Sequence, residues 1–140
     1  MGENMKCRRI VFQQKGDERG SLVVIESNKD IPFEIKRVFY MIHTLNDVAR
    51  GQHANQESDF ILVNVQGSIK IKTHDGKKEE VYILDKKDEG IYIPHMIWKE
   101  MYDFSDDAIL IVFSNYHYNE NEYIRDFEQY CKLINLGEMS

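Results

Sequence analysis

The sequence contains little of what marks membrane-bound, disulfide-rich or nucleic-acid-binding proteins. No apolar run approaches the roughly 20 residues that cross a bilayer, and the N-terminal residues lack a signal-peptide core, so we expect a cytoplasmic protein without a membrane partner. The two cysteines, Cys7 and Cys131, have no CxxC spacing and support neither a disulfide framework nor a zinc knuckle, which predicts two free thiols. A net charge of −6 disfavours nonspecific binding to nucleic acid, whose affinity depends on Lys and Arg.

Hydrophobic residues make up 42% and charged residues 30% of the 140 residues, a composition typical of one globular domain, here residues 1–140. Most of the chain alternates between β-branched or aromatic runs and short turn segments. The runs that we expect to form strands are residues 21–27, 34–44, 59–66, 68–74, 79–85, 90–104 and 108–115. Their number and near-regular spacing predict an all-β sandwich or barrel.

Two local signals stand out from this pattern. Asp75-Gly76 predicts a hairpin with a tight two-residue turn, because Asp-Gly supplies the positive φ angles that such a turn needs. Near the C-terminus, apolar residues recur at spacings of four, three and four, which predicts an amphipathic helix from about Asn119; the residues are Tyr123, Phe127, Tyr130 and Ile134. Asn119 or Asn121 is the expected cap, and Gly137 the expected end.

Residues 50–56, RGQHANQ, place an imidazole and a carboxamide two positions apart. In an extended segment alternate side chains share a face, so His53 and Asn55 are expected to point the same way. The stretch compares with the cupin metal motif, His-x-His followed by Glu and Gly, but Asn55 stands where the second histidine would be. Lys99, directly after Trp98, stands where the second cupin motif ends in histidine. Because Asn binds transition metals weakly and an ammonium repels cations, we predict no metal site and no cofactor.

Without a metal, a site here must act through its own side chains. His53 can exchange protons near neutral pH, while Arg37 and Arg50 can hold a phosphate or carboxylate through bidentate hydrogen bonds. On spacing alone, the alternative is that His53 is a surface or packing residue.

Five segments, in this order, resemble the sugar-nucleotide 3,4-ketoisomerases of the cupin superfamily. The segments are GDERGSLVVIE (16–26), IPFEIKRVFY (31–40), ARGQHANQ (49–56), IYIPHMIWKEMYDFS (91–105) and YNENEYIRDFEQY (118–130). Together they span most of the chain, from about Gly16 to Tyr130.

This resemblance implies a cupin-type jelly-roll barrel with a short C-terminal helix, usually a homodimer with exchanged N-terminal strands. It implies an isomerase that acts, without a metal, on a dTDP-linked 4-keto-6-deoxyglucose in the biosynthesis of surface glycans such as the O-antigen of lipopolysaccharide. The ketone moves from C4 to C3, because a base can remove the acidic C3 proton and the resulting enediol is reprotonated at C4.

The family motif reads Arg-Gly-x-His-Ala-His, so Arg50 and His53 carry over by position. Asn55 replaces the second histidine of the family's acid/base pair; its amide can hydrogen-bond a substrate oxygen but cannot take up a proton at neutral pH. Either His53 moves protons alone, another group substitutes, or activity is lost. His95, before Trp98, and His43 are the candidate substitutes.

The expected substrate-binding residues are Arg37, Tyr40, Arg50 and Trp98, with the family's arginine at position 37 lying near the nucleotide. Strand alternation places Arg37 and His43 on one face and Tyr40 on the other, and the sequence leaves open which face looks inward. For Trp98, packing in the barrel is the alternative to a substrate contact.

Three readings follow from these residues. The first is a dTDP-4-keto-6-deoxyglucose 3,4-ketoisomerase; the second is a related nucleotide-sugar epimerase, which leaves the ketone at C4. The third is a catalytically inactive cupin that binds a nucleotide sugar or a partner enzyme, a reading that depends on Asn55.

Overall fold

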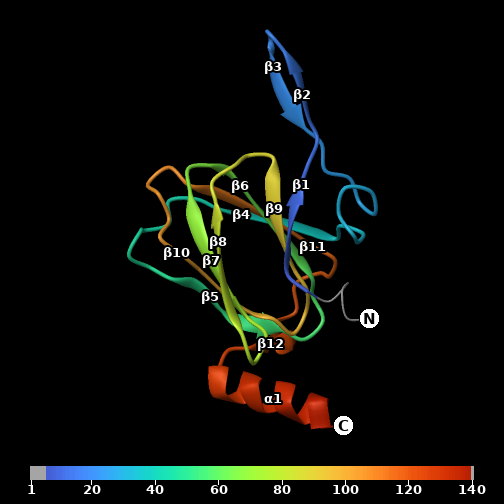
Figure 1. Cartoon of the computed structure of the whole chain (residues 1–140), viewed down its shortest axis with the longest axis vertical. Helices are drawn as coiled ribbons and strands as arrows, with labels where there is room; N and C mark the ends of the chain where they lie inside the picture. The colour runs from blue at the N-terminus through green and yellow to red at the C-terminus, as the bar shows by residue number, and fades with distance from the viewer. Residues whose placement is uncertain (1–5, 140) are drawn as a thin grey trace.

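The computed structural model describes residues 6–139 as a β-barrel with one C-terminal α-helix (Figure 1). The strands, in chain order, are β1 (Arg8–Val11), β2 (Gln14–Asp17), β3 (Gly20–Val23), β4 (Arg37–Met41), β5 (Arg50–Asn55), β6 (Phe60–Gln66), β7 (Ile69–His74), β8 (Glu79–Leu84), β9 (Glu89–Ile93), β10 (Trp98–Tyr102), β11 (Ile109–Ser114) and β12 (Tyr123–Ile124). A 3-10 helix covers Glu120–Glu122, and α1 covers Phe127–Met139.

Within these residues, two five-stranded antiparallel sheets face each other, in the orders β1-β9-β6-β11-β4 and β12-β5-β10-β7-β8. From β4 to β12, consecutive strands alternate between the sheets except at the β7–β8 hairpin, as in a jelly roll, so the predicted all-β cupin-type fold is confirmed. The run predicted as one strand over 90–104 divides into β9 and β10, which belong to different sheets. Pro94, which has no N–H to donate, and Met96, with a φ of 63°, lie in the connection.

Strand β6 contributes side chains to two hydrophobic cores, one between the sheets and one under the N-terminal segment. Phe60 and Leu62 point into the core between the sheets, which is formed mainly by β6, β7, β9, β10 and β11. Ile61 and Val63 point the other way, into a second core under the segment that carries Phe12, Ile31 and Phe33. Because both faces of β6 are buried, its first four residues, Phe60 to Val63, are continuously apolar instead of alternating.

The C-terminal segment differs from its prediction at both ends. The predicted helix from Asn119 is wrong, because Tyr123–Ile124 pairs with β5 as β12 and the α-helix begins at Phe127. Asn119 caps the short 3-10 helix, while the Asp126 carboxylate accepts hydrogen bonds from the first turn of α1. The helix also continues past Gly137.

The Asp75-Gly76 hairpin joins β7 to β8 as predicted, but its turn is longer than two residues. His74 pairs with Glu79, so four residues form the connection, closed by a hydrogen bond from Asp75 N to Lys78 O. Gly76 alone in this turn has a positive φ, of 100°, and a Cβ there would lie 2.6 Å from Ile134 of α1. The glycine therefore allows the helix to pack against the hairpin.

The N-terminal strands have two different environments. Strand β1 pairs with β9 of the same chain. Strands β2 and β3 pair with each other in a hairpin that stands away from the barrel, at the end opposite α1 (Figure 1). The side chain of Leu22, in this hairpin, is 55% exposed, and that of Val24, just after the hairpin, is 39% exposed.

Helix α1 is attached to the barrel through Tyr130, whose ring is fully buried with Trp98, Ala54 and Ile124. The Tyr130 hydroxyl lies 2.9 Å from the carbonyl oxygen of His74 and 2.8 Å from that of Met96, and can donate to either. No helix among residues 6–139 has the length and hydropathy needed to span a bilayer, and the thiols of Cys7 and Cys131 are free.

We expect Tyr130→Phe to lower the free energy of unfolding by about 1–2 kcal/mol, because it removes a buried donor from two backbone carbonyls and leaves the ring in place. Urea denaturation followed by circular dichroism measures this. Tyr118→Phe, at a 61% exposed position, is the matched control and should change stability by far less. Equal effects of the two variants would contradict the role given to the Tyr130 hydroxyl.

Candidate active site

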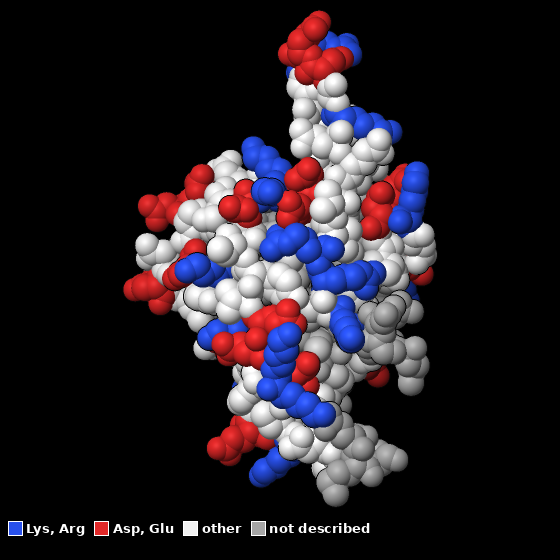
Figure 2. Space-filling view, viewed as in Figure 1, with Lys and Arg blue, Asp and Glu red and all other residues white. Residues whose placement is uncertain are grey.

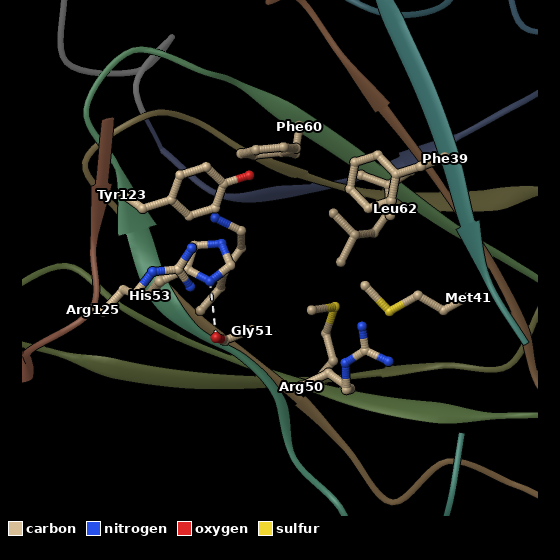
Figure 3. A pocket seen from close by; sticks show the side chains of 12 residues that line it. Phe39, Met41, Arg50, Gly51, His53, Phe60, Leu62, Tyr123 and Arg125 are labelled. Carbon is tan, nitrogen blue, oxygen red and sulfur yellow. Dashed lines mark hydrogen bonds between the residues drawn. The ribbon is translucent and has the colours of Figure 1, made fainter. Parts of the chain in front are cut away.

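A cavity of about 290 Å³ opens between the two sheets. Aromatic and aliphatic side chains from β4, β6, β10 and β11 form one part of its wall; the residues are Phe39, Met41, Phe60, Leu62, Met101 and Val112. Polar residues from β5, β10 and the C-terminal segment form the other; they are Arg50, His53, Lys99, Tyr123 and Arg125, with Gly51. Figure 3 shows Phe39, Leu62 and Met41 across the cavity from His53, Tyr123 and Arg125. An apolar cavity with a few convergent polar groups is the usual form of a small-molecule site.

An irregularity in β5 brings two of the predicted residues onto the cavity wall. His53 pairs with Lys99 of β10, but Gly51 pairs with the next residue, Glu100, so Gln52 is an additional residue in the register. Gly51 and Gln52 have φ angles of 87° and 55°. In a regular strand Arg50 and His53 would lie on opposite faces, and the extra residue places both on the inner face.

His53 is held as a neutral imidazole with a defined tautomer. Its Nδ1 lies 2.8 Å from the carbonyl oxygen of Gly51, which can only accept, so Nδ1 carries the proton and Nε2 carries the lone pair. Burial and the Lys99 ammonium lower the pKa of His53 to about 3. The ring packs against Tyr123, with centroids 4.6 Å apart, so the imidazole is fixed both by a hydrogen bond and by an aromatic contact.

Lys99 is a buried cation, 4% exposed, on the same inner face. Its Nζ donates a hydrogen bond of 2.9 Å to Asn55 Oδ1 and lies 4.3 Å from the centre of the Phe60 ring. Burial lowers the pKa of Lys99 to about 7, although the Glu122 carboxylate favours the charged form.

Asn55 is buried and is not among the residues that line the cavity. It contacts a cavity residue through its hydrogen bond to Lys99. In this structure the Asn55 side chain holds the lysine through its Oδ1, and the expected hydrogen bond to a substrate oxygen stays a prediction. Glu122 lies close by, and its carboxylate accepts hydrogen bonds from the backbone N–H groups of Glu57 and Ser58 and from the Ser58 hydroxyl. Burial opposes ionisation of Glu122, but these hydrogen bonds outweigh it and keep its pKa below the ordinary value.

Three arginines approach the cavity. Arg50 and Arg125 line it. Arg37 lies beside it, with its guanidinium 5.4 Å from the ring centre of Phe39 and 5.9 Å from that of Phe60. The Nε and Nη2 atoms of Arg37 are buried and meet no hydrogen-bond acceptor among the described residues.

Tyr123 and Arg125 were not predicted from the sequence. The helical spacing assigned Tyr123 to a packing stripe, and only the pairing of β12 with β5 brings this segment to the cavity. The signal in the sequence was the pair of branched and aromatic residues, Tyr123-Ile124, before Asp126, a residue type that commonly precedes a helix.

Four predicted residues lie elsewhere, and none of them lines the cavity; they are His95, Tyr40, Trp98 and His43. His95 is held outside it, with Nδ1 2.9 Å from Asp59 Oδ1, so the proposed substitution of His95 for the missing histidine is not supported by the geometry. Tyr40 points outward from β4 and is 66% exposed. Trp98 is buried under α1, against Phe127 and Tyr130, as its packing alternative expected.

His43 follows the end of β4 with a φ of 57°, and it lines a different surface depression, near Asp106 and Ile109. Within residues 6–139, no three His, Cys, Asp or Glu side chains gather closely enough to hold a metal ion.

The barrel and its polar inner face define a cupin-type small-molecule site with acid–base groups. Residues 5–135 match the protein family described as "FdtA: WxcM-like, C-terminal". The chain is 39% identical over 130 residues to TDP-4-oxo-6-deoxy-alpha-D-glucose-3,4-oxoisomerase of Aneurinibacillus thermoaerophilus, covering 93% of this chain and 94% of that protein.

Two solved structures extend the comparison. A 3,4-ketoisomerase from Helicobacter canadensis is 40% identical, with a TM-score of 0.91 and coverage of 94% of this chain and 98% of that one. A histidine-to-asparagine variant of the 3,4-ketoisomerase from Thermoanaerobacterium thermosaccharolyticum, in complex with TDP-4-keto-6-deoxyglucose, is 32% identical, with a TM-score of 0.90 and coverage of 93% and 94%. The chain belongs to this family of sugar 3,4-ketoisomerases, so the predicted resemblance is confirmed.

The lowered pKa of His53 predicts a loss of stability in acid. Between pH 6.5 and about 3 the unfolded chain binds a proton at His53 that the folded chain excludes, so stability should fall as the pH decreases, by up to about 1.4 kcal/mol per pH unit. Urea denaturation between pH 5 and 7 should show a flatter dependence for His53→Asn than for the wild type. The exposed His117, replaced by Asn, is the control; the same flattening in this control would contradict the assignment.

Proposed function

We propose that this chain converts a dTDP-linked 4-keto-6-deoxyglucose into its 3-keto isomer through an enediol intermediate. The observation that carries the proposal is the position of His53 in an apolar cavity, neutral and with its Nε2 lone pair available, beside a buried ammonium. A neutral base and a nearby cation are what abstraction of a proton next to a ketone requires. The names of the related 3,4-ketoisomerases support the choice of substrate.

In this proposal, His53 is the catalytic residue that takes the proton from C3. Its hydrogen bond to the Gly51 carbonyl keeps the proton on Nδ1, so Nε2 faces the reaction as the base. The resulting imidazolium then returns a proton at C4, which places the hydroxyl there and leaves the ketone at C3. Because the wall opposite His53 is formed by apolar side chains such as Phe39 and Leu62, water is excluded from the intermediate.

Arginines are proposed to hold the nucleotide part of the substrate. Arg50 and Arg125 line the cavity and suit a diphosphate oxygen, and Arg37 beside the cavity has unpaired Nε and Nη2 donors that a bound diphosphate can pair. The chain has a net charge of −6, but this does not prevent binding of a single anionic ligand, which needs only a local group of cations.

We place the reaction in the cytoplasm, in the supply of an activated deoxysugar for a surface glycan such as the O-antigen of lipopolysaccharide. The 3-keto sugar that the reaction creates can be aminated at C3, and we expect an amination to be the next step.

The purified protein, incubated with dTDP-4-keto-6-deoxyglucose in D₂O, should give a 3-keto product, as followed by NMR. The new C–H at C4 keeps the protium from C3 where His53 transfers it directly, and carries deuterium only where the imidazolium exchanges with solvent first. His53→Asn should lower the rate by at least about 100-fold, because it removes the base. His95→Asn is the matched control and should stay within a few-fold of the wild type, since its ring binds Asp59 outside the cavity.

Other outcomes would identify the alternatives. Exchange at C3 or C5 with the ketone still at C4 would indicate an epimerase. Binding of the sugar nucleotide with neither conversion to a 3-keto sugar nor exchange would mean that the chain is an inactive binding protein, and would overturn the proposed function.

We also propose that the chain is a homodimer in which the N-terminal hairpin is exchanged. Strand β1 already has its partner, β9, so the β2–β3 hairpin is the part of the N-terminus that is free to reach a second copy. In the face shown in Figure 2, charged side chains cover the tip of this hairpin, while much of the shaft below it is uncharged. An exposed hairpin with apolar residues such as Leu22 is a natural site for association.

Light scattering after size exclusion should give twice the 16.6 kDa chain mass. Leu22→Glu should shift the protein toward the monomer, because it places a charge in the proposed contact. Val81→Glu, at an exposed residue on the edge strand β8, is the control and should leave the mass unchanged. A monomeric wild type, or a Leu22→Glu variant that stays dimeric, would refute the exchange.

A further inference from the structure

Lys99 lies where a second proton-transfer group for the cavity would have to be. It pairs directly with His53 across strands β5 and β10, and side chains at such paired positions lie side by side. It lines the same cavity, and its Nζ is held against Asn55 and the Phe60 ring. The cavity therefore presents an imidazole and an amine to one small space.

The groups around Lys99 allow its amine to exist in both protonation states. Burial lowers the pKa of Lys99 to about 7, with the Arg37 guanidinium acting in the same direction. The Glu122 carboxylate, and more weakly the Cys7 side chain, act against this and favour the ammonium. His53, on the facing strand, is neutral at this pH because of burial and the Lys99 charge itself. An amine so placed can both give and accept a proton near neutral pH.

We propose that Lys99 is the second catalytic residue of the isomerase and moves the proton between the two substrate oxygens, while His53 moves the proton between the two carbons. This role rests on the proposed function. It assigns to Lys99 the work for which the family motif has a second histidine, at the position that Asn55 occupies here.

The two steps balance. First, His53 Nε2 takes the C3 proton, the C3–H electrons form the C3=C4 double bond, and the C4 carbonyl oxygen takes a proton from the Lys99 ammonium, which gives a neutral enediol. Second, the C3 hydroxyl returns a proton to the Lys99 amine and becomes the ketone, while C4 takes the proton from the His53 imidazolium. Both residues end in their starting states, and the substrate has exchanged its ketone and hydroxyl.

This division keeps one positive charge on the His53–Lys99 pair throughout. The Lys99 ammonium suppresses protonation of His53, so His53 becomes a stronger base when Lys99 gives up its proton to the substrate oxygen. The two transfers therefore support each other, because neither produces two adjacent cations in an apolar site.

Asn55 acts in this scheme as a positioning residue. Its Oδ1 accepts the hydrogen bond from Nζ, and a carboxamide holds the amine without competing for its proton. A histidine at this position would compete, so the replacement of the family histidine by Asn suits a site whose second proton carrier is a lysine.

Three measurements on the purified enzyme test the role of Lys99, with dTDP-4-keto-6-deoxyglucose as substrate. Lys99→Met, which suits a buried site, should stay folded and lower kcat by about 100-fold or more, with KM changed only a few-fold. Lys99→Ala should regain activity in proportion to added methylamine, which can occupy the space of the lost amine. The wild-type kcat/KM should decline above about pH 7, where the free enzyme loses the ammonium, and Lys99→Met should lack this decline.

The controls separate this role from the proposed function. Lys132→Ala, at an exposed lysine of α1, should match the wild type and should not respond to methylamine. An active wild type together with a folded Lys99→Met within fivefold of its rate would overturn the role of Lys99 alone. So would a folded, inactive Lys99→Ala that methylamine fails to rescue, or a Lys99→Arg variant with the wild-type rate, which would show that charge is sufficient. A wild type that makes no 3-keto sugar would overturn the proposed function and this role together.

Discussion

Strand β5 is held against β10 in a register that shifts by one residue at Gln52, and the site depends on this pairing. The shift puts Arg50 on the inner face together with His53, and the pairing sets Lys99 beside the imidazole. Gly51 permits it, because its φ is 87° and a Cβ there would lie 3.0 Å from the Met101 side chain. A regular strand at this point would turn Arg50 away from the cavity.

The second requirement is the exclusion of water from the inner face. The apolar side chains between the sheets bury a lysine that a surface strand would leave charged and solvated; Lys99 is 4% exposed. Burying a charge is costly unless polar groups surround it, and here Asn55 and Glu122 supply them. The same burial that stabilises the barrel therefore keeps the imidazole of His53 neutral and brings the pKa of the Lys99 amine to about 7.

Much of the fold could be predicted from the sequence, because alternation and turn residues act locally. Two elements differ from their prediction, one for a local reason and one because of a residue pairing with a distant strand. The apolar run over 90–104 contains Pro94, and it crosses from one sheet to the other. Tyr123 has helical spacing with Phe127 and Tyr130, but the free edge of β5 offers it backbone hydrogen bonds, and these decide its conformation. Intrinsic propensity is a weak preference that such pairing readily overrides.

The sequence by itself determined the kind of chemistry: His53 and Arg50 match the family motif, and Asn55 and Lys99 stand where metal-binding histidines would be. The tertiary structure decided which residues meet. It turned Arg37 and Phe39 inward and Tyr40 outward, kept His95 and Trp98 out of the cavity, and brought Tyr123 and Arg125 into it. The physical reason is that the face a strand buries, and the pKa of a group on it, depend on neighbours supplied by strands distant in the chain. In the sequence, Lys99 is only evidence against a metal site; the fold places it beside His53 as an amine that can donate a proton.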